Sequence, residues 1–126
     1  MSEVVVESEQ HMDDEACQTV AEFFSVYANA TRIRFFCALR SGPKTVSELA
    51  EYADVSLQNA SQHLRLMRDK GAVRAEKDAQ RVYYSIASPK FLQGVKLIRD
   101  ALEEEFQRKV GISSAINQEQ KASLGQ

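Results

Sequence analysis

The strongest constraint on the fold is a pair of short helical patterns that only Asp54-Val55-Ser56 separate. We expect Ser47 to cap the first helix, and the second spans about 57–70, with apolar residues three or four positions apart. Gly71 then ends the second helix, and residues 73–86, rich in β-branched and aromatic side chains, predict a β-hairpin. Two closely spaced helices followed by a hairpin predict a winged helix-turn-helix, mostly helical with a β-hairpin wing.

The second helix carries side chains suited to the edges of DNA bases on the face opposite its apolar residues. Amide side chains pair with adenine, arginine pairs with guanine, and hydroxyls bind phosphates or bases. No acidic residue occurs from Ser56 to Met67, whereas a helix face that only contacts water usually mixes Glu with Lys. Arg81, near the hairpin tip, is placed to contact a flanking minor groove or a phosphate. The candidate DNA-binding residues are therefore Ser56, Gln58, Asn59, Ser61, Gln62, His63, Arg65 and Arg81.

Other interpretations of these residues stay open. The polar face could merely be solvated, and His63, beside the apolar stripe, could be packed rather than bound to phosphate. A winged helix can also serve only as a protein–protein interaction module. Catalysis is disfavoured because a nucleophile needs an activating neighbour, and the two histidines lie near the N-terminus (His11) and on the predicted DNA face. We therefore expect a transcriptional regulator that binds double-stranded DNA, is not an enzyme and uses no cofactor.

Charge along the chain supports a nucleic-acid partner although the formal net charge is −2. Residues 1–28 hold seven acids and no Lys or Arg, whereas residues 29–86 hold ten bases against six acids. The basic excess coincides with the predicted winged helix. The 126 residues suffice for one domain, and no apolar run approaches the roughly 18 residues that span a membrane. Because the acidic N-terminus is unlike a secretory signal, we expect a cytoplasmic protein.

Helical periodicity predicts further elements on both sides of the winged helix. We expect helices at about 13–28, opened by Asp13, at 30–40, capped by Asn29, and at 89–108. The expected organisation is a flexible acidic arm at 1–12, a DNA-binding and dimerisation domain at 13–108 and a flexible tail at 109–126.

Several motifs together resemble the ArsR/SmtB family of metal- and stress-responsive repressors. The matching segments are Asn29–Arg34 for the start of a helix, Val46–Ala50 for the next helix, Val55–Arg65 for the recognition helix, and Gly71–Val73 with Val82–Tyr84 for the strand and wing. The resemblance covers about residues 16–108, and the wing tip departs from it by lacking the usual Gly. It implies a homodimer built from the first and last helices, whose two recognition helices bind a palindromic operator about one DNA turn apart.

The resemblance also bears on the signal that releases the repressor from DNA. The family's helix-three metal site needs a Cys-x-Cys-like element where this chain has Lys44–Ser47, and its last-helix site needs histidines that residues 89–103 lack. Neither metal site is expected. Cys37 resembles the helix-two cysteine of the sulfide- and persulfide-responsive members. Their partner cysteine lies in the last helix, however, and the second thiol here is Cys17, on the first helix.

Three roles for the two cysteines stay open. A thiol switch would release the DNA when an oxidant, persulfide or electrophile modifies an accessible thiolate, with Cys37 as the regulatory thiol and Cys17 as its resolving partner or a bystander. Both could instead be small apolar fillers. A metal or metalloid ion could also bind through Cys17 and Cys37, with His11, Asp13 or Asp14 beside Cys17, although Asp13 one helical turn away is a weak indication. The thiol switch is the interpretation that we favour, without an identified inducer.

Overall fold

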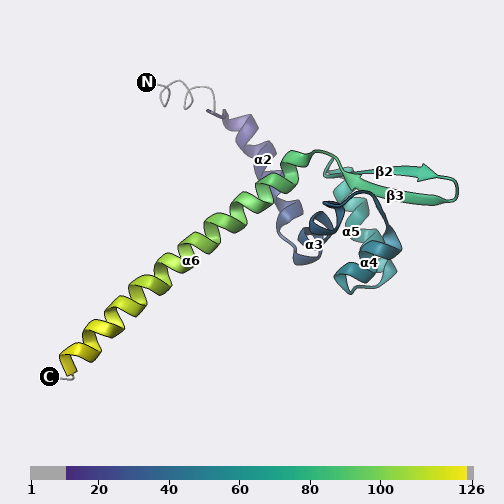
Figure 1. Ribbon diagram of the computed structural model, residues 1–126. Coiled ribbons are helices and arrows are strands. Elements are labelled where there is room, and N and C mark those ends of the chain that lie inside the picture. Colours follow the sequence, from purple (N-terminus) through teal and green to yellow (C-terminus); the bar gives the residue numbers. More distant parts are fainter. Residues whose placement is uncertain (1–10, 125–126) are drawn as a thin grey trace. The chain divides into compact units, whose positions relative to one another are not determined.

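The computed structural model describes residues 11–124, and it has the predicted fold class, mostly helical with a β-hairpin wing. Residues up to Ser88 form one compact unit and residues from Pro89 another, and each is described by itself. The elements in chain order are α2 (Asp14–Tyr27), α3 (Ala30–Leu39), β1 (Lys44–Thr45), α4 (Val46–Ala53), α5 (Leu57–Asp69), β2 (Val73–Asp78), β3 (Arg81–Ile86) and α6 (Pro89–Leu124) (Figure 1). The expected arm at 1–12 lies outside the described residues except for His11 and Met12, which are exposed and precede α2.

Hydrogen bonds from backbone amides to nearby side-chain oxygens explain where three of the helices begin. Asp13, Asn29 and Ser56 cap α2, α3 and α5 by accepting a hydrogen bond from the amide three residues later, at 2.8, 3.2 and 3.0 Å. Asn29 and Ser56 are the caps that the sequence predicts, whereas Asp13, expected as an acid in the first turn of its helix, is the cap just before that turn. At the other end of α5, Gly71 takes a φ of 79°, the left-handed conformation expected of a helix terminator.

The start of α4 differs from the prediction, because Thr45 and not Ser47 is its cap. The Thr45 amide donates to Glu48 Oε1 at 3.0 Å, and the Glu48 amide donates to Thr45 Oγ1 at 3.3 Å. This reciprocal capping box satisfies two backbone amides at once. Ser47 has Ala50 three positions later and cannot form one.

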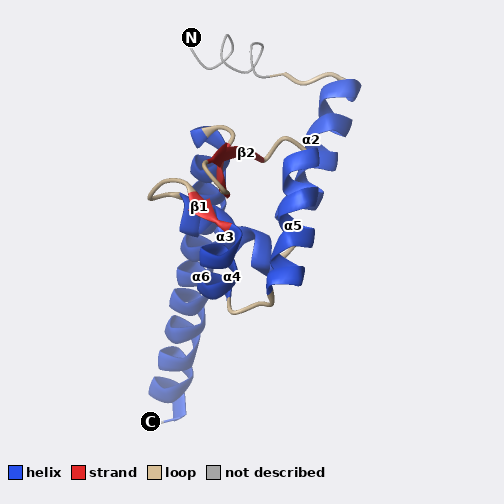
Figure 2. Cartoon of the chain, turned by 90° about the vertical axis from the view of Figure 1, so that its right-hand side faces the viewer, coloured by secondary structure: helices blue, strands red, loops and turns tan. Residues whose placement is uncertain are grey.

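β2 and β3 form the predicted wing, an antiparallel hairpin closed by the two-residue loop Ala79-Gln80. Ala79 has a φ of 57°, a value that glycine usually takes in such loops. The sheet has a third strand that the sequence analysis missed: β1 pairs antiparallel with Tyr83–Tyr84, which gives the strand order β1-β3-β2. β1 and β2 are seen in red in Figure 2. Two residues are too few to show the alternation that indicates a strand.

The core of the first unit lies where α3, α4, α5 and the sheet contact one another. α5 contributes Ala60, Leu64 and Met67, all fully buried, as their spacing predicts. Leu57 was expected on the same face but is 55% exposed. It is the first residue of α5, and side chains on a helix lean toward its N-terminus, so Leu57 extends past the packed turns. The large side chains that are fully buried are Val26, Phe35, Phe36, Leu49, Leu64, Met67 and Val73.

α6 is longer than the sequence predicts. It runs for 36 residues to Leu124, whereas the expected helix ended near 108 and a flexible tail followed. The segment 109–124 is polar but holds no proline, and its one glycine, Gly111, costs a helix only about 1 kcal/mol relative to Ala. Once a helix exists, each added residue gains a backbone hydrogen bond, so elongation continues through such a segment. Within residues 11–124 no helix is both long and apolar enough to cross a membrane.

Candidate nucleic-acid interface

α5 turns a polar face to solvent on the side opposite its buried residues. The structure brings five of the predicted DNA-binding residues together on this face, and none of them is acidic. They are Gln58, Asn59, Ser61, Gln62 and Arg65, each of them exposed. The amides and the guanidinium can pair with base edges, and the hydroxyl can bind a base or a phosphate. We call these five residues the polar face of α5.

The turn before α5 sets the direction of that helix. Asp54 takes a left-handed conformation with φ of 55° and ψ of 52°, which Asp tolerates better than most residues. The Val55 amide then donates to the Ala50 carbonyl at 3.0 Å, which closes the end of α4. Ser56 is exposed, and its Oγ accepts the capping hydrogen bond from Asn59. Its hydroxyl proton can still be donated to an acceptor on DNA.

His63 lies at the edge of the polar face, on the flank of α5 that contacts α3. Its Nδ1 accepts a hydrogen bond from Arg32 Nε at 3.1 Å, and its ring packs edge-on against Phe35 with 6.4 Å between centroids. Burial, and after it the positive charge of Arg32, lowers the pKa of His63. His63 is therefore a packed histidine that is still partly exposed. Sequence analysis placed Arg32 only within a family motif, and no local pattern indicated its contact with His63.

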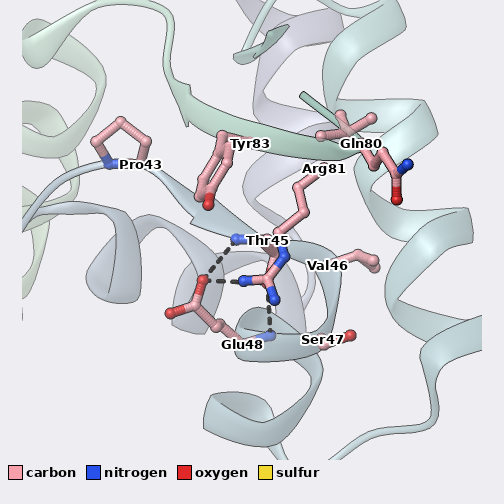
Figure 3. Close-up of a pocket in the computed structure, with 9 residues that line it drawn as sticks. Pro43, Thr45, Val46, Ser47, Glu48, Gln80, Arg81 and Tyr83 are labelled. Atoms are coloured by element: carbon pink, nitrogen blue, oxygen red, sulfur yellow. Dashed lines mark hydrogen bonds between the residues drawn. The ribbon is translucent and has the colours of Figure 1, made fainter. Parts of the chain in front are cut away.

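Arg81 begins β3 beside the wing loop and extends back over a pocket of about 730 Å³. The pocket is lined by Pro43, Thr45, Val46, Ser47, Glu48, Gln80, Arg81, Val82 and Tyr83. Figure 3 shows the Arg81 side chain extending from the wing toward Thr45 and Glu48 at the start of α4. The pKa of Glu48 is lowered first by its backbone and side-chain hydrogen bonds with Thr45 and then by the charges of Lys44 and Arg81. Arg81 therefore lies between the wing and α4 and remains exposed to solvent.

The two cysteines lie on different helices and are both free thiols. Cys37, on α3, is half-buried between the buried residues Phe36 and Ala38, and the Arg40 guanidinium donates to its carbonyl at 2.7 Å. Cys17, on α2, is exposed, and its Sγ lies 3.9 Å from the Met12 carbonyl, to which it donates. Within the described part of the chain, no group of three or more His, Cys, Asp or Glu side chains is placed where it could hold a metal ion.

Comparison with known proteins places this geometry in a family. A family model described as a helix-turn-helix domain matches residues 27–76. Over 93 residues the chain is 32% identical to a transcriptional repressor SmtB homolog of Synechocystis, with 74% of this chain and 70% of that protein covered. Over 81 residues it is 33% identical to a probable mercury resistance operon repressor of Streptomyces lividans, with 64% of this chain and 65% of that repressor covered, just under two thirds of its length.

A solved structure supports the same conclusion. The homodimeric winged helix-turn-helix DNA-binding domain of Mb0332 from Mycobacterium bovis, a possible ArsR-family regulator, superposes with a TM-score of 0.68 at 25% identity, covering 79% of this chain and 94% of that one. The fold and the polar recognition helix thus define a winged helix-turn-helix DNA-binding protein. The chain belongs to the ArsR/SmtB family and is a DNA-binding transcriptional repressor of that type. Its relatives regulate transcription and are not enzymes, which confirms the expectation of a non-catalytic protein.

Proposed function

We propose that the chain acts in the cytosol as a homodimer that places α5 in the major groove of a palindromic operator and leaves the DNA when Cys37 is modified. The observation that carries the DNA part is the polar face of α5, which lacks acids and lies opposite residues that are fully buried. This face has no role in the core, and its side-chain types match base edges. Family membership favours DNA over the protein–protein interaction module that the sequence left open.

The side chains of the interface differ in the part of the DNA that they are expected to contact. Gln58, Asn59 and Gln62 are suited to adenine and Arg65 to guanine, while Ser56 and Ser61 can reach phosphates or bases. Arg81, on the wing, would bind a phosphate or a flanking minor groove and so support binding to most sequences alike. Specificity is therefore expected to come from α5, and general affinity from the wing.

Dimerisation is supported by apolar side chains that the single chain leaves exposed. Phe24 on α2 is 51% exposed, and Ile98, Leu102 and Phe106 on α6 are exposed at spacings of four that place them on one helical stripe. Each of these helices would contact a second copy, as the homodimeric Mb0332 domain suggests by analogy. A two-fold dimer would present its recognition helices to half-sites roughly 34 Å apart.

Cys37 is the proposed regulatory thiol because of its place on α3. The same helix contacts the recognition helix through Arg32 and Phe35, which both touch His63. Its neighbours Phe36 and Ala38 are buried, so an added oxygen or sulfur on the half-buried Cys37 is expected to disturb the packing of α3. A peroxide would convert the thiolate into a sulfenic acid, which a second thiol can condense with, losing water, to give a disulfide that a reductant reverses. Cys17 is that second thiol or a bystander.

The test is a titration of an operator, selected from random duplexes by the wild-type protein, at fixed salt. We expect the reduced protein to bind, treatment with peroxide or a persulfide to weaken binding at least tenfold, and dithiothreitol to restore it. Cys37→Ser should stay bound throughout, and Cys17→Ser is the matched control on the other thiol. If Cys37→Ser responds like the wild type, or the wild type does not respond, the thiol switch is wrong.

A second candidate signal is a thiophilic metal or metalloid ion. It is favoured by one relative, the probable mercury resistance operon repressor, and by the preference of soft ions for thiolates. Cys37 and Cys17 would be the ligands. Adding mercuric ion as a further arm of the same titration separates the two signals: release by the ion but not by peroxide or persulfide would favour the metal.

A further inference from the structure

Arg32 connects three helices at the edge of the proposed DNA interface. Its Nη1 donates to the Ser25 carbonyl in the last turn of α2 at 3.1 Å, and its Nε donates to His63 Nδ1 on α5 at 3.1 Å. Its own backbone amide donates to the capping Asn29 at 3.2 Å. The last carbonyls of a helix lack partners within the helix, so the bond to Ser25 satisfies a group that α2 leaves open. Both the backbone amide and the guanidinium of Arg32 are therefore held by hydrogen bonds, and these fix the direction of the side chain.

The contact with His63 dictates which ring nitrogen carries the proton. A guanidinium has only donors and stays charged, so Nδ1 of His63 can take part only as an unprotonated acceptor. A neutral imidazole carries its single proton on the other nitrogen, Nε2. Burial and the charge of Arg32 both lower the pKa of His63, which keeps the ring neutral at neutral pH. The geometry thus selects the Nε2–H tautomer.

The Nε2 edge of His63 is open to solvent. Within the described residues, no buried side-chain nitrogen or oxygen lacks a hydrogen-bond partner. Nε2 of His63 has no such partner among residues 11–124, so it must be accessible to solvent. His63 follows Gln62 of the polar face and precedes the buried Leu64, so its free edge lies at the border of the proposed DNA contact. A donor at the border of a recognition helix faces the DNA backbone more than the base edges.

We infer that Arg32 is a positioning residue, which holds His63 as the Nε2–H tautomer so that α5 presents a neutral donor to a phosphate oxygen of the operator. The inference rests on the proposed placement of α5 in the major groove. Hydrogen bonds to a charged acceptor are stronger than neutral ones, so one such contact contributes about tenfold in affinity. Arg32 would act on DNA only through His63, and at the same time tie the end of α2 to the recognition helix.

The first experiment measures the tautomer directly by nitrogen-15 NMR of the histidine rings in the full-length protein without DNA. We expect protonated Nε2 and unprotonated Nδ1 at His63 near pH 7.5. Arg32→Met, which keeps the chain length but removes the donors, should yield a mixture of tautomers, and Arg32→Lys should restore part of the preference. Arg34→Met, on the exposed side of the same helix, is the matched control and should leave the spectrum of His63 unchanged. A proton on Nδ1 in the wild type would overturn the inference.

The second experiment is a double-mutant cycle in operator affinity at fixed salt, with Arg32→Met and with His63→Phe, which keeps a ring against Phe35. Each single variant should bind about tenfold more weakly, and the double variant no more weakly than His63→Phe alone. If Arg32→Met still weakens binding in the His63→Phe background, Arg32 acts by another route and the inference is wrong. Thermal unfolding of each variant identifies a loss caused by misfolding, in which case Arg32→Lys replaces Arg32→Met in the cycle.

The two experiments separate this inference from the proposed function. A wild-type protein that binds no duplex in a salt-sensitive way would overturn the placement of α5 on DNA, whatever the tautomer of His63. If the wild type binds the operator but the effects of Arg32→Met and His63→Phe on affinity simply add, the proposed function stands and the role of Arg32 is rejected.

Discussion

The helices α5 and α6 are both amphipathic, yet they use their apolar residues in opposite ways. In α5, Leu64 and Met67 are fully buried within the first unit. In α6, Leu102 is 66% exposed and Phe106 is 62% exposed. The chain therefore folds with the apolar face of α5 and leaves its polar face to solvent, whereas it leaves the apolar face of α6 uncovered. According to the proposed function, the polar face of α5 binds DNA and the apolar face of α6 binds a second copy of the chain.

The magnitude of apolar burial explains why the face of α6 needs a partner. Burying one large apolar side chain contributes about 1.5–3 kcal/mol, and α6 exposes several of them along one stripe. Left in water, such a stripe is a site for association. The polar face of α5, in contrast, is exposed to water at no cost in free energy. It contributes binding free energy only when base edges replace that water. The comparison thus predicts different consequences for changes on the two helices.

The largest effect is expected on α6. Leu102→Glu would bury a charge in the proposed apolar seam between copies, so we expect the dimer dissociation constant to rise more than a hundredfold and operator binding to be lost. Leu97→Glu is the matched control, because Leu97 is equally exposed, at 69%, but lies five residues earlier on another side of the helix. Sedimentation measures both. A wild-type monomer at micromolar concentration, or equal effects of both variants, would show that this stripe is not the interface.

The next effect concerns the buried side of α5. Leu64→Ala should lower the free energy of unfolding by about 2–5 kcal/mol, because it removes buried methyl groups and leaves a cavity. Leu57→Ala on the same helix should cost under about 1 kcal/mol, because Leu57 is already half in water. Urea unfolding followed by circular dichroism compares them. If both variants lose a similar amount of unfolding free energy, Leu57 is buried and not half-exposed.

The polar side of α5 should behave in the reverse manner. Gln62→Ala is expected to weaken binding to the selected operator by about 1–3 kcal/mol, the value of one bidentate base contact. It should leave the unfolding free energy and the dimer unchanged, because Gln62 is exposed. Binding to operator and to random duplex is measured by fluorescence anisotropy. If Gln62→Ala binds the operator as the wild type does, this residue takes no part in base recognition.

The smallest effect is a dependence of stability on pH through His63. Burial and the charge of Arg32 lower its pKa in the folded state below the value of about 6.5 found in unfolded chains. The unfolded chain therefore takes up a proton before the folded chain does as the pH falls, and stability decreases below about pH 6.5. Above that pH His63 does not make the stability depend on pH. Urea unfolding between pH 5 and 8 should show this decrease in the wild type and a smaller one in His63→Gln. If the unfolding free energy depends on pH in the same way in both proteins, the decrease does not come from His63.

Features encoded by neighbouring residues could be predicted from the sequence. Asn29 and Ser56 cap the helices that the sequence assigned to them, α2 begins within one residue of the predicted start at Asp13, and the hairpin follows α5 as expected. The polar face of α5 is also local, since it depends only on which residues share one side of a helix. Caps and helical periodicity act over three or four residues, so they need no knowledge of the rest of the chain. Two local features were exceptions. Thr45 and not Ser47 caps α4, and the end of α6 was missed because polar residues without a helix breaker permit both a helix and a flexible tail.

Features that depend on distant residues came only from the folded chain. Lys44–Thr45 becomes a strand because it meets Tyr83–Tyr84, and Arg32 reaches His63 across 31 positions. Leu57 has the spacing of a core residue, yet the folded chain leaves it half-exposed. A contact between distant residues leaves no periodic signal in either segment. Which groups meet is decided by how α3, α5 and the sheet pack together, and close packing admits few arrangements of their side chains.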